Sequence, residues 1–214
     1  MCPQCGLVKV SAPLDYDLNR YVRIYRGVFD TDLETRINVG RVARVMKFVP
    51  LKSRVLDWGC SCGNFLARAE QYYACVGYEP ATTAPSMRVC RAPIYTDPKD
   101  IEGTFGAVTM FDVVEHMPYP IEGIRSILPF VQQEGGVIIV STPSPHNYRG
   151  TLNTYYHLWP GQHMYLWTLE ALSRMMSGLG MECIYSGNDE GALRTHSQYK
   201  DDLLTAVFRR TKRS

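Results

Sequence analysis

The stretch Arg54-Val-Leu-Asp-Trp-Gly-Cys-Ser-Cys-Gly-Asn-Phe-Leu66 carries the strongest structural signal in the chain. The apolar pair before Asp57 favours a buried strand, and the residues after Gly63 favour the start of a helix. Gly59 and Gly63 occupy the turn between them, where a residue without a Cβ can take unusual dihedral angles and leave room for a ligand. The stretch therefore predicts a strand, a tight turn and a helix that can approach a nucleoside cofactor closely.

This turn differs from the dinucleotide fingerprint Gly-x-Gly-x-x-Gly, because Cys60, Ser61 and Cys62 separate its two glycines. An acid before the first glycine would repel a pyrophosphate, but it suits a cofactor that carries an ammonium or a sulfonium group. The stretch resembles motif I of class I S-adenosylmethionine-dependent methyltransferases, with Ser61 where the middle glycine usually stands. We interpret Cys60 and Cys62 as small turn residues rather than metal ligands. A glycine turn that binds nothing is the alternative for the motif alone.

Further acids follow two other predicted strands. Glu79 ends the short strand 75–79 and lies 22 residues after Asp57, close to the spacing of about 20 residues at which an acid reaches a ribose hydroxyl. Residues 105–111 predict a central parallel strand, with Asp112 at its carboxyl end, where open α/β sheets bind ligands. The segment Asp-Val-Val-Glu-His-Met-Pro118 resembles the corresponding segment of methyltransferases related to the ubiquinone O-methyltransferases.

The resemblance spans roughly residues 50–210 and implies a Rossmann-like α/β fold. That fold has a seven-stranded, mostly parallel sheet with helices on both faces and a C-terminal antiparallel strand. It also implies S-adenosylmethionine as the cofactor and S-adenosylhomocysteine as the product. The residues that the resemblance implies in cofactor binding lie in the glycine turn and after three strands: Asp57, Gly59, Cys60, Ser61, Gly63, Phe65, Glu79, Pro80, Asp97, Phe111, Asp112 and Val113.

We predict two regions in the chain, an N-terminal region of residues 1–49 and a methyltransferase domain of residues 50–214. The N-terminal region opens with Cys2-Pro-Gln-Cys-Gly6, which is half of a zinc ribbon. Because zinc needs four ligands and no second Cys-x-x-Cys pair follows, we expect no zinc site within one monomer, unless a distant residue or another chain completes it. Thr31 and Glu34 then predict the capped start of a helix over 31–49. In the resembled family such helices cover the cofactor.

Histidine is the most plausible base for a methyltransferase, since its ordinary pKa lies near neutrality. His116 follows the central strand, and His163 lies in the aromatic-rich segment 144–167, which suggests a lid or an acceptor pocket. We expect one of these two histidines to remove the acceptor proton. His146 and His157 are less firmly anchored, and Tyr21 and Tyr25 are candidates for contacts with the acceptor.

A metal site is the alternative reading of Asp112, Glu115 and His116. Some related O-methyltransferases bind a divalent ion with an acid, an acid and a histidine at this spacing, and hard oxygen ligands suit magnesium. We expect no metal, because the first acid is common in relatives not known to need one. Activity that EDTA abolishes and magnesium restores would support the ion.

The composition is that of an ordinary globular protein, with 45% hydrophobic residues, 21% charged residues and a formal net charge of +2. This charge makes no strong electrostatic case for nucleic acid or for an anionic membrane. No apolar run approaches the roughly 20 residues that span a bilayer. Seven cysteines, an odd number, and no signal segment indicate a reducing, cytoplasmic setting. We expect a monomer or a homodimer.

The predicted function is methyl transfer from S-adenosylmethionine to oxygen, nitrogen or carbon of a small-molecule acceptor. A nucleic-acid methyltransferase is one alternative. Against it, Phe111-Asp-Val-Val-Glu-His116 stands where amino-directed DNA enzymes carry Asn/Asp-Pro-Pro-Tyr/Phe, and no Pro-Cys dipeptide exists for attack on cytosine. A non-catalytic module that binds S-adenosylmethionine is the other alternative.

Overall fold

The computed structural model describes residues 1–10, 17–145, 152, 155, 157–158, 161–193 and 203–211. The chain divides into two compact units. One, called here the glycine-turn unit, comprises residues 17–110 and 129–138. The other, called the histidine unit, comprises residues 1–16, 111–128 and 139–214.

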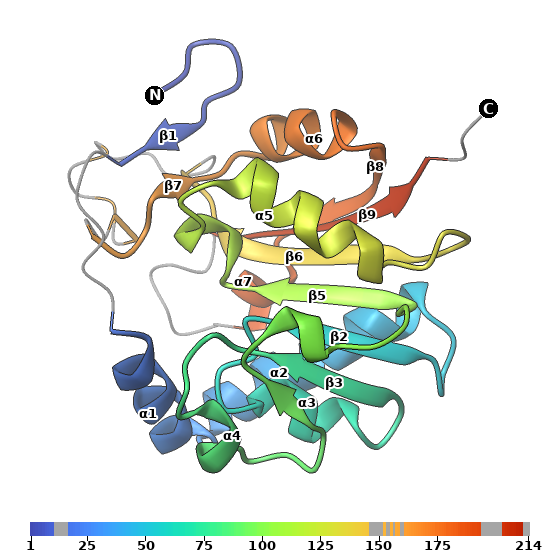
Figure 1. The fold of residues 1–214 in the computed structure, drawn as a ribbon. Coiled ribbons are helices and arrows are strands. Elements are labelled where there is room, and N and C mark those ends of the chain that lie inside the picture. Colours follow the sequence, from blue (N-terminus) through green and yellow to red (C-terminus); the bar gives the residue numbers. More distant parts are fainter. Residues whose placement is uncertain are drawn as a thin grey trace. The chain divides into compact units, whose positions relative to one another are not determined.

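The fold is built on a seven-stranded sheet with the strand order β4-β3-β2-β5-β6-β9-β8 (Figure 1). Strand β2 runs parallel to β3 and β5, and β3 runs parallel to β4, whereas β8 is antiparallel to β9. This arrangement confirms the predicted Rossmann-like, mostly parallel sheet with an antiparallel C-terminal strand. The strand bounds are β2 Arg54–Trp58, β3 Ala74–Tyr78, β4 Ile94–Tyr95, β5 Ala107–Phe111, β6 Val137–Pro143, β8 Met181–Gly187 and β9 Leu203–Arg210.

The glycine-turn unit contains β2, β3, β4 and most of β5, with their helices. Strand β5 is buried along its whole length, which accounts for its apolar sequence. Thr31 caps the predicted helix by accepting a hydrogen bond from the Glu34 amide, as expected. The helix predicted to start after Gly63 begins at Asn64 and ends at Ala69. The helices are α1 Leu18–Val28, α2 Asp32–Phe48, α3 Asn64–Ala69, α4 Ala84–Met87 and the 3-10 turn η1 Pro98–Asp100.

The histidine unit contains β8, β9 and most of β6. Strand β1 (Val8–Lys9) pairs antiparallel with β7 (Tyr165–Leu166), and the two lie side by side in Figure 1. Thr168 caps α6 (Leu169–Ser177) through the Ala171 amide, as its sequence predicts. The remaining helical elements of this unit are the 3-10 turn η2 Val114–His116, α5 Pro120–Ile127 and α7 Asp189–Leu193. The 3-10 turn η3 Leu128–Phe130 begins in this unit and continues into the glycine-turn unit.

Two short elements of this unit were not predicted from the sequence. Strand β7 lies inside the aromatic-rich segment 144–167, and its two residues pair with the equally short β1. Helix α7 lies in the connection between β8 and β9. Among the described residues, no helix has the length and apolar character that crossing a membrane requires.

Candidate functional site

The glycine turn has the strained backbone that its sequence predicts. Three of its residues have positive φ angles: Gly59 at 80°, Ser61 at 51° and Gly63 at 88°. The amides of Gly59 and Cys60 both donate to the Tyr78 carbonyl, at 2.8 and 3.0 Å, which ties the turn to the end of β3. Ser61 therefore takes a conformation that costs a residue with a Cβ roughly 1 kcal/mol.

Packing within the unit favours glycine at position 63. A Cβ at this position would lie 2.5 Å from Cys90 Sγ and 3.4 Å from Ile94 Cδ1. The space that the glycine leaves is therefore filled by side chains of the same unit. Close packing and the positive φ thus both favour glycine here. That Gly63 also makes room for the cofactor stays a prediction.

Glu79 joins the end of β3 to the glycine turn. This residue is 6% exposed, and its Oε2 accepts a hydrogen bond from the Ser61 amide at 3.0 Å. Its Oε1 accepts from the Ala81 amide, also at 3.0 Å. Burial raises the pKa of Glu79, and these two hydrogen bonds oppose the shift. Each carboxylate oxygen has a further lone pair, so Glu79 can still accept hydrogen bonds from a ligand hydroxyl.

Asp57 is buried at the end of β2. Its Oδ1 accepts a hydrogen bond from Thr109 Oγ1 at 2.7 Å. Burial raises the pKa of Asp57 to about 6, and the bond from Thr109 limits the rise. At neutral pH the buried carboxylate is therefore mostly ionised, and a cationic ligand group would stabilise it.

The other predicted residues of this unit have different environments. Cys60 and Phe65 are buried, whereas Pro80 and Asp97 are exposed. Asp97 accepts a hydrogen bond from the Lys99 amide at 2.9 Å and so caps η1. Burial raises the pKa of the Cys60 thiol well above its usual range and that of Cys62 to about 11. Both thiols are thus protonated at neutral pH.

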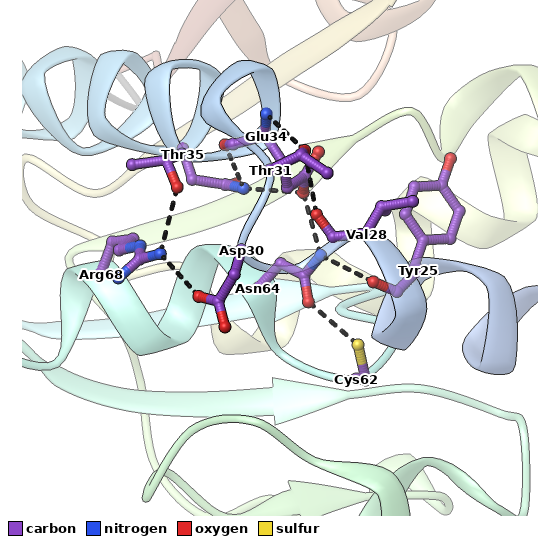
Figure 2. Close-up of polar contacts among 10 residues, drawn as sticks. Tyr25, Val28, Asp30, Thr31, Glu34, Thr35, Cys62, Asn64 and Arg68 are labelled. Carbon is purple, nitrogen blue, oxygen red and sulfur yellow. Dashed lines mark hydrogen bonds and ion pairs between the residues drawn. The ribbon is translucent and has the colours of Figure 1, made fainter.

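A polar network that the sequence analysis missed joins α2 to the residues after the glycine turn (Figure 2). Asn64 Nδ2 donates to Glu34 Oε1 at 3.0 Å and to the Tyr25 carbonyl at 3.2 Å. Asn64 Oδ1 accepts from the Cys62 thiol at 3.0 Å. Asn38 Nδ2 also donates to Glu34 Oε1, at 2.8 Å. The sequence identified Glu34 as part of the capped helix start, but it did not predict which side chains bind to Glu34.

Arg68 adds a second connection between α3 and the start of α2. Its Nη2 donates to Thr35 Oγ1 at 3.2 Å and lies 3.7 Å from Asp30 Oδ1 (Figure 2). Tyr21 and Tyr25, expected near the acceptor, lie on α1 with ring centroids 6.1 Å apart. Helices α1 and α2 are thus connected to α3, the helix that follows the glycine turn.

In the histidine unit, the backbone changes direction directly after β5. Asp112 has a φ of 57°, and its amide donates to the Ser141 carbonyl at 2.8 Å. Phe111 is buried and Val113 is half-buried. Glu115 is fully buried, and its Oε2 accepts a hydrogen bond from Thr142 Oγ1 at 2.9 Å. Burial, followed by the charge of Asp112, raises the pKa of Glu115 well above its ordinary value.

The two predicted histidines lie together. The ring centroids of His116 and His163 are 4.7 Å apart in an edge-to-face arrangement. Burial lowers the pKa of both rings, that of His163 to about 4 with a further contribution from His116. Both rings are therefore neutral at neutral pH. His157 contributes its carbonyl to this group, and His146 lies outside the described residues.

The predicted site residues are thus distributed over both units. Asp57, Glu79 and the glycine turn belong to the glycine-turn unit, whereas Asp112, His116 and His163 belong to the histidine unit. Within each unit the expected residues converge: Glu79 contacts the turn, and the histidines contact each other.

The N-terminal Cys-x-x-Cys-Gly element forms a tight turn in the histidine unit. The Gly6 amide donates to the Cys2 carbonyl at 2.9 Å, and the Cys2 amide donates to the Leu7 carbonyl at 2.7 Å. A hollow of about 740 Å³ lies beside it, lined among others by Cys5, Gly6 and Thr168. None of the predicted site residues lines this hollow.

A sheet of this strand order, with a glycine turn and a buried acid after the next strand, defines a Rossmann-like α/β protein of the methyltransferase class. Residues 31–186 match the family model described as "Methyltransferase domain", and the chain belongs to that family. This result confirms the predicted enzyme class, a class I S-adenosylmethionine-dependent methyltransferase. No curated protein sequence matches the chain significantly.

Solved structures with the same fold are distant in sequence. The plantazolicin methyltransferase BpumL, solved with a monoazolic desmethylPZN analogue and S-adenosylhomocysteine, is 15% identical with a TM-score of 0.61, over 90% of each chain. The Burkholderia thailandensis 1,6-didemethyltoxoflavin-N1-methyltransferase is 13% identical with a TM-score of 0.58, over 99% of this chain and 98% of its own. The [4+2]-cyclase SpnF is 14% identical with a TM-score of 0.62, over 95% and 99%. At this identity the likeness establishes the fold alone.

Proposed function

We propose that this methyltransferase acts on a small-molecule acceptor and that the cofactor binds at the glycine turn. The observation that carries the proposal is the bond from the Ser61 amide to Glu79, which fixes a buried acid against the turn. Glu79 keeps lone pairs for two adjacent ribose hydroxyls. Asp57, ionised at neutral pH, suits a cationic group of the cofactor.

The remaining cofactor contacts are part of the same proposal. On the glycine-turn unit, these are the backbone of Gly59 to Gly63, Phe65, Pro80 and, beside the adenine, Asp97. On the histidine unit, they are Phe111, Asp112 and Val113. The positive φ of Asp112 supports a special role, because functional sites often contain such strained residues.

When bound, the cofactor supplies an electrophilic methyl group on a sulfonium. The protein then has to align the acceptor with that group and take up the acceptor proton. His116 and His163 are the proposed proton acceptors. His116 is the better of the two, because the pKa of about 4 makes His163 a weak base.

The acceptor class is supported by the similar structures and by the charge of the chain. The two methyltransferases described above are named for, or solved with, natural-product-like small molecules. The net charge of +2 provides little attraction for a nucleic acid. Similarity to the ubiquinone O-methyltransferase group rests on the segment Asp112–Pro118. The [4+2]-cyclase SpnF has the same fold, so the second candidate is a function other than methyl transfer.

The setting and division of the chain are also proposals. All seven cysteines are free thiols, which fits a cytoplasmic protein that acts as a monomer or a homodimer. Residues 1–49, including the Cys-x-x-Cys-Gly element, would cap the methyltransferase domain of residues 50–214.

Methyl transfer can be tested directly with methyl-tritiated S-adenosylmethionine and size-fractionated extracts of the source organism. We expect label in a fraction of small molecules, and the mass of the product then identifies the acceptor.

The Glu79→Gln variant should transfer methyl groups at least about 10-fold more slowly than the unmodified chain. An amide nitrogen donates hydrogen bonds, so it cannot replace a carboxylate oxygen that accepts them. Label in nucleic acid would overturn the acceptor class. A folded protein that binds the cofactor but labels nothing would favour the non-catalytic alternative.

A further inference from the structure

The histidine unit holds a group of three side chains, and the proposed role of its two histidines in methyl transfer does not account for the buried Glu115 beside them. Glu115 and His116 belong to η2, and His163 lies just before β7. One ligand atom from each of the three residues lies within 4.8 Å of the other two. We call these residues the Glu–His–His cluster. Asp112, which the sequence suggested as a metal ligand, is not part of it.

Both histidines of the cluster are held in one tautomer. His116 Nδ1 lies 2.8 Å from the Gln162 carbonyl oxygen, and His163 Nδ1 lies 2.6 Å from the His157 carbonyl oxygen. A carbonyl oxygen can only accept, so the proton of each neutral ring must be on Nδ1. The lone pair is therefore on Nε2 in both rings. Metal-binding histidines are commonly oriented in this way, by a hydrogen bond from the second ring nitrogen.

Glu115 supplies an independent indication of a ligand. Its side chain is 0% exposed, and Thr142 holds only Oε2. Oε1 is buried and has no hydrogen-bond partner among the described residues. A buried carboxylate oxygen without a partner is costly, and a bound cation would remove that cost.

The donor set identifies the class of cation. Two imidazole nitrogens and one carboxylate oxygen suit zinc and similar transition metals, whereas magnesium prefers oxygen ligands. Three protein ligands of this type, with a position left for water or substrate, are typical of catalytic zinc sites. Zn–N distances of about 2.0–2.1 Å place tetrahedral ligand atoms about 3.4 Å apart. The ligand atoms of the cluster, which lie within 4.8 Å of one another, would therefore have to move closer together to bind an ion.

We propose that Glu115, His116 and His163 bind a divalent transition-metal ion, with Zn²⁺ as the reference ion. The ligands are Glu115 Oε1 and the Nε2 atoms of both histidines. This proposal replaces our expectation of no metal, and it does not rest on the proposed methyl transfer. An ion bound here would also prevent either Nε2 from accepting a proton, so metal binding decides whether these histidines can act as bases.

The experiment is metal binding to the full chain, freed of metal by chelation. It uses a Cys2→Ser, Cys5→Ser background, because thiolates at the N-terminal turn would bind zinc themselves. Isothermal titration with Zn²⁺ should show one ion per chain. Co²⁺ should bind at the same site and give a d–d absorption spectrum without a sulfur charge-transfer band. Mg²⁺ in roughly 10-fold excess should not displace either ion.

Three variants make the assignment specific. Glu115→Gln and His163→Gln should each weaken Zn²⁺ binding at least about 100-fold, whereas Asp112→Asn should retain it within about 3-fold. Circular dichroism of each variant shows whether it is folded, and His163→Gln serves if Glu115→Gln does not fold. Absence of saturable Zn²⁺ binding would overturn the proposal. So would unchanged affinity in folded His163→Gln, or loss of binding in Asp112→Asn alone. Calorimetry with S-adenosylmethionine on the same proteins tests the cofactor site separately.

Discussion

Asp57 shows how one residue combines a local pattern with a tertiary effect. Its position, at the end of a buried strand before a glycine, was readable from the sequence. Its pKa of about 6 was not, because burial of the carboxylate depends on the neighbouring strands that cover it. The bond from Thr109, which opposes the shift, comes from β5, 52 residues away in the chain.

The pKa of Asp57 predicts a pH dependence of stability. Between pH 3.8, the ordinary pKa of an aspartate, and about pH 6, Asp57 is protonated in the folded state but ionised in the unfolded state. Protonation of Asp57 therefore stabilises the folded state fully below pH 3.8. This contribution, about 3 kcal/mol in all, is lost as the pH rises through 6. Asp57→Asn should lack this loss. Urea unfolding of both proteins at intervals from pH 4 to pH 7.5 measures the difference.

Thr109→Val provides the matched control for this prediction. It removes the hydrogen bond that lowers the pKa, so the loss of stability should extend to higher pH than in the unmodified chain. Parallel pH profiles of the unmodified chain and Asp57→Asn would contradict the assigned pKa shift.

At the scale of elements, Asn64 connects the glycine turn to the N-terminal helices. The capped start of α2 and the helix after the turn were both predicted from local signals. Their connection was not, because hydrogen bonds that join Asn64 to Tyr25 and Glu34 span 39 and 30 residues. The pairing of the two-residue strands β1 and β7 could not be predicted for the same reason, because no local pattern indicates it. Propensity and periodicity describe neighbours in the chain, whereas these contacts depend on the fold.

Asn64→Leu, which keeps the size of the side chain, should therefore loosen the N-terminal helices. It removes the hydrogen bonds that Asn64 donates to the Tyr25 carbonyl and to Glu34 Oε1, at a cost of roughly 1–3 kcal/mol in the free energy of unfolding. Hydrogen exchange should become faster in α1 and at the start of α2. Glu34→Gln is the control, because its amide oxygen can still accept from Asn64, and it should stay within about 1 kcal/mol of the unmodified chain. Equal stability of Asn64→Leu and Glu34→Gln would show that the network does not hold these helices.

At the scale of the whole molecule, the seven-stranded, mostly parallel sheet was expected from a resemblance rather than from physical reasoning alone, and no order of its strands was predicted. Individual strands follow from buried apolar runs, but their order depends on crossovers that hydrophobic patterns do not encode. The family match over residues 31–186 confirms the class of enzyme that the glycine turn suggested. The acceptor could not be read in this way, since one fold serves many substrates.

Calorimetric titration of S-adenosylmethionine into the full chain tests whether the cofactor binds at the glycine turn. We predict saturable binding that Gly59→Val abolishes, because Gly59 has a φ of 80° at the proposed contact. Gly27→Val is the matched control, since a Cβ at Gly27 has no atom within 4 Å, and it should bind within about 2-fold of the unmodified chain. Cofactor affinity that is the same in folded Gly59→Val and in the unmodified chain would contradict the account.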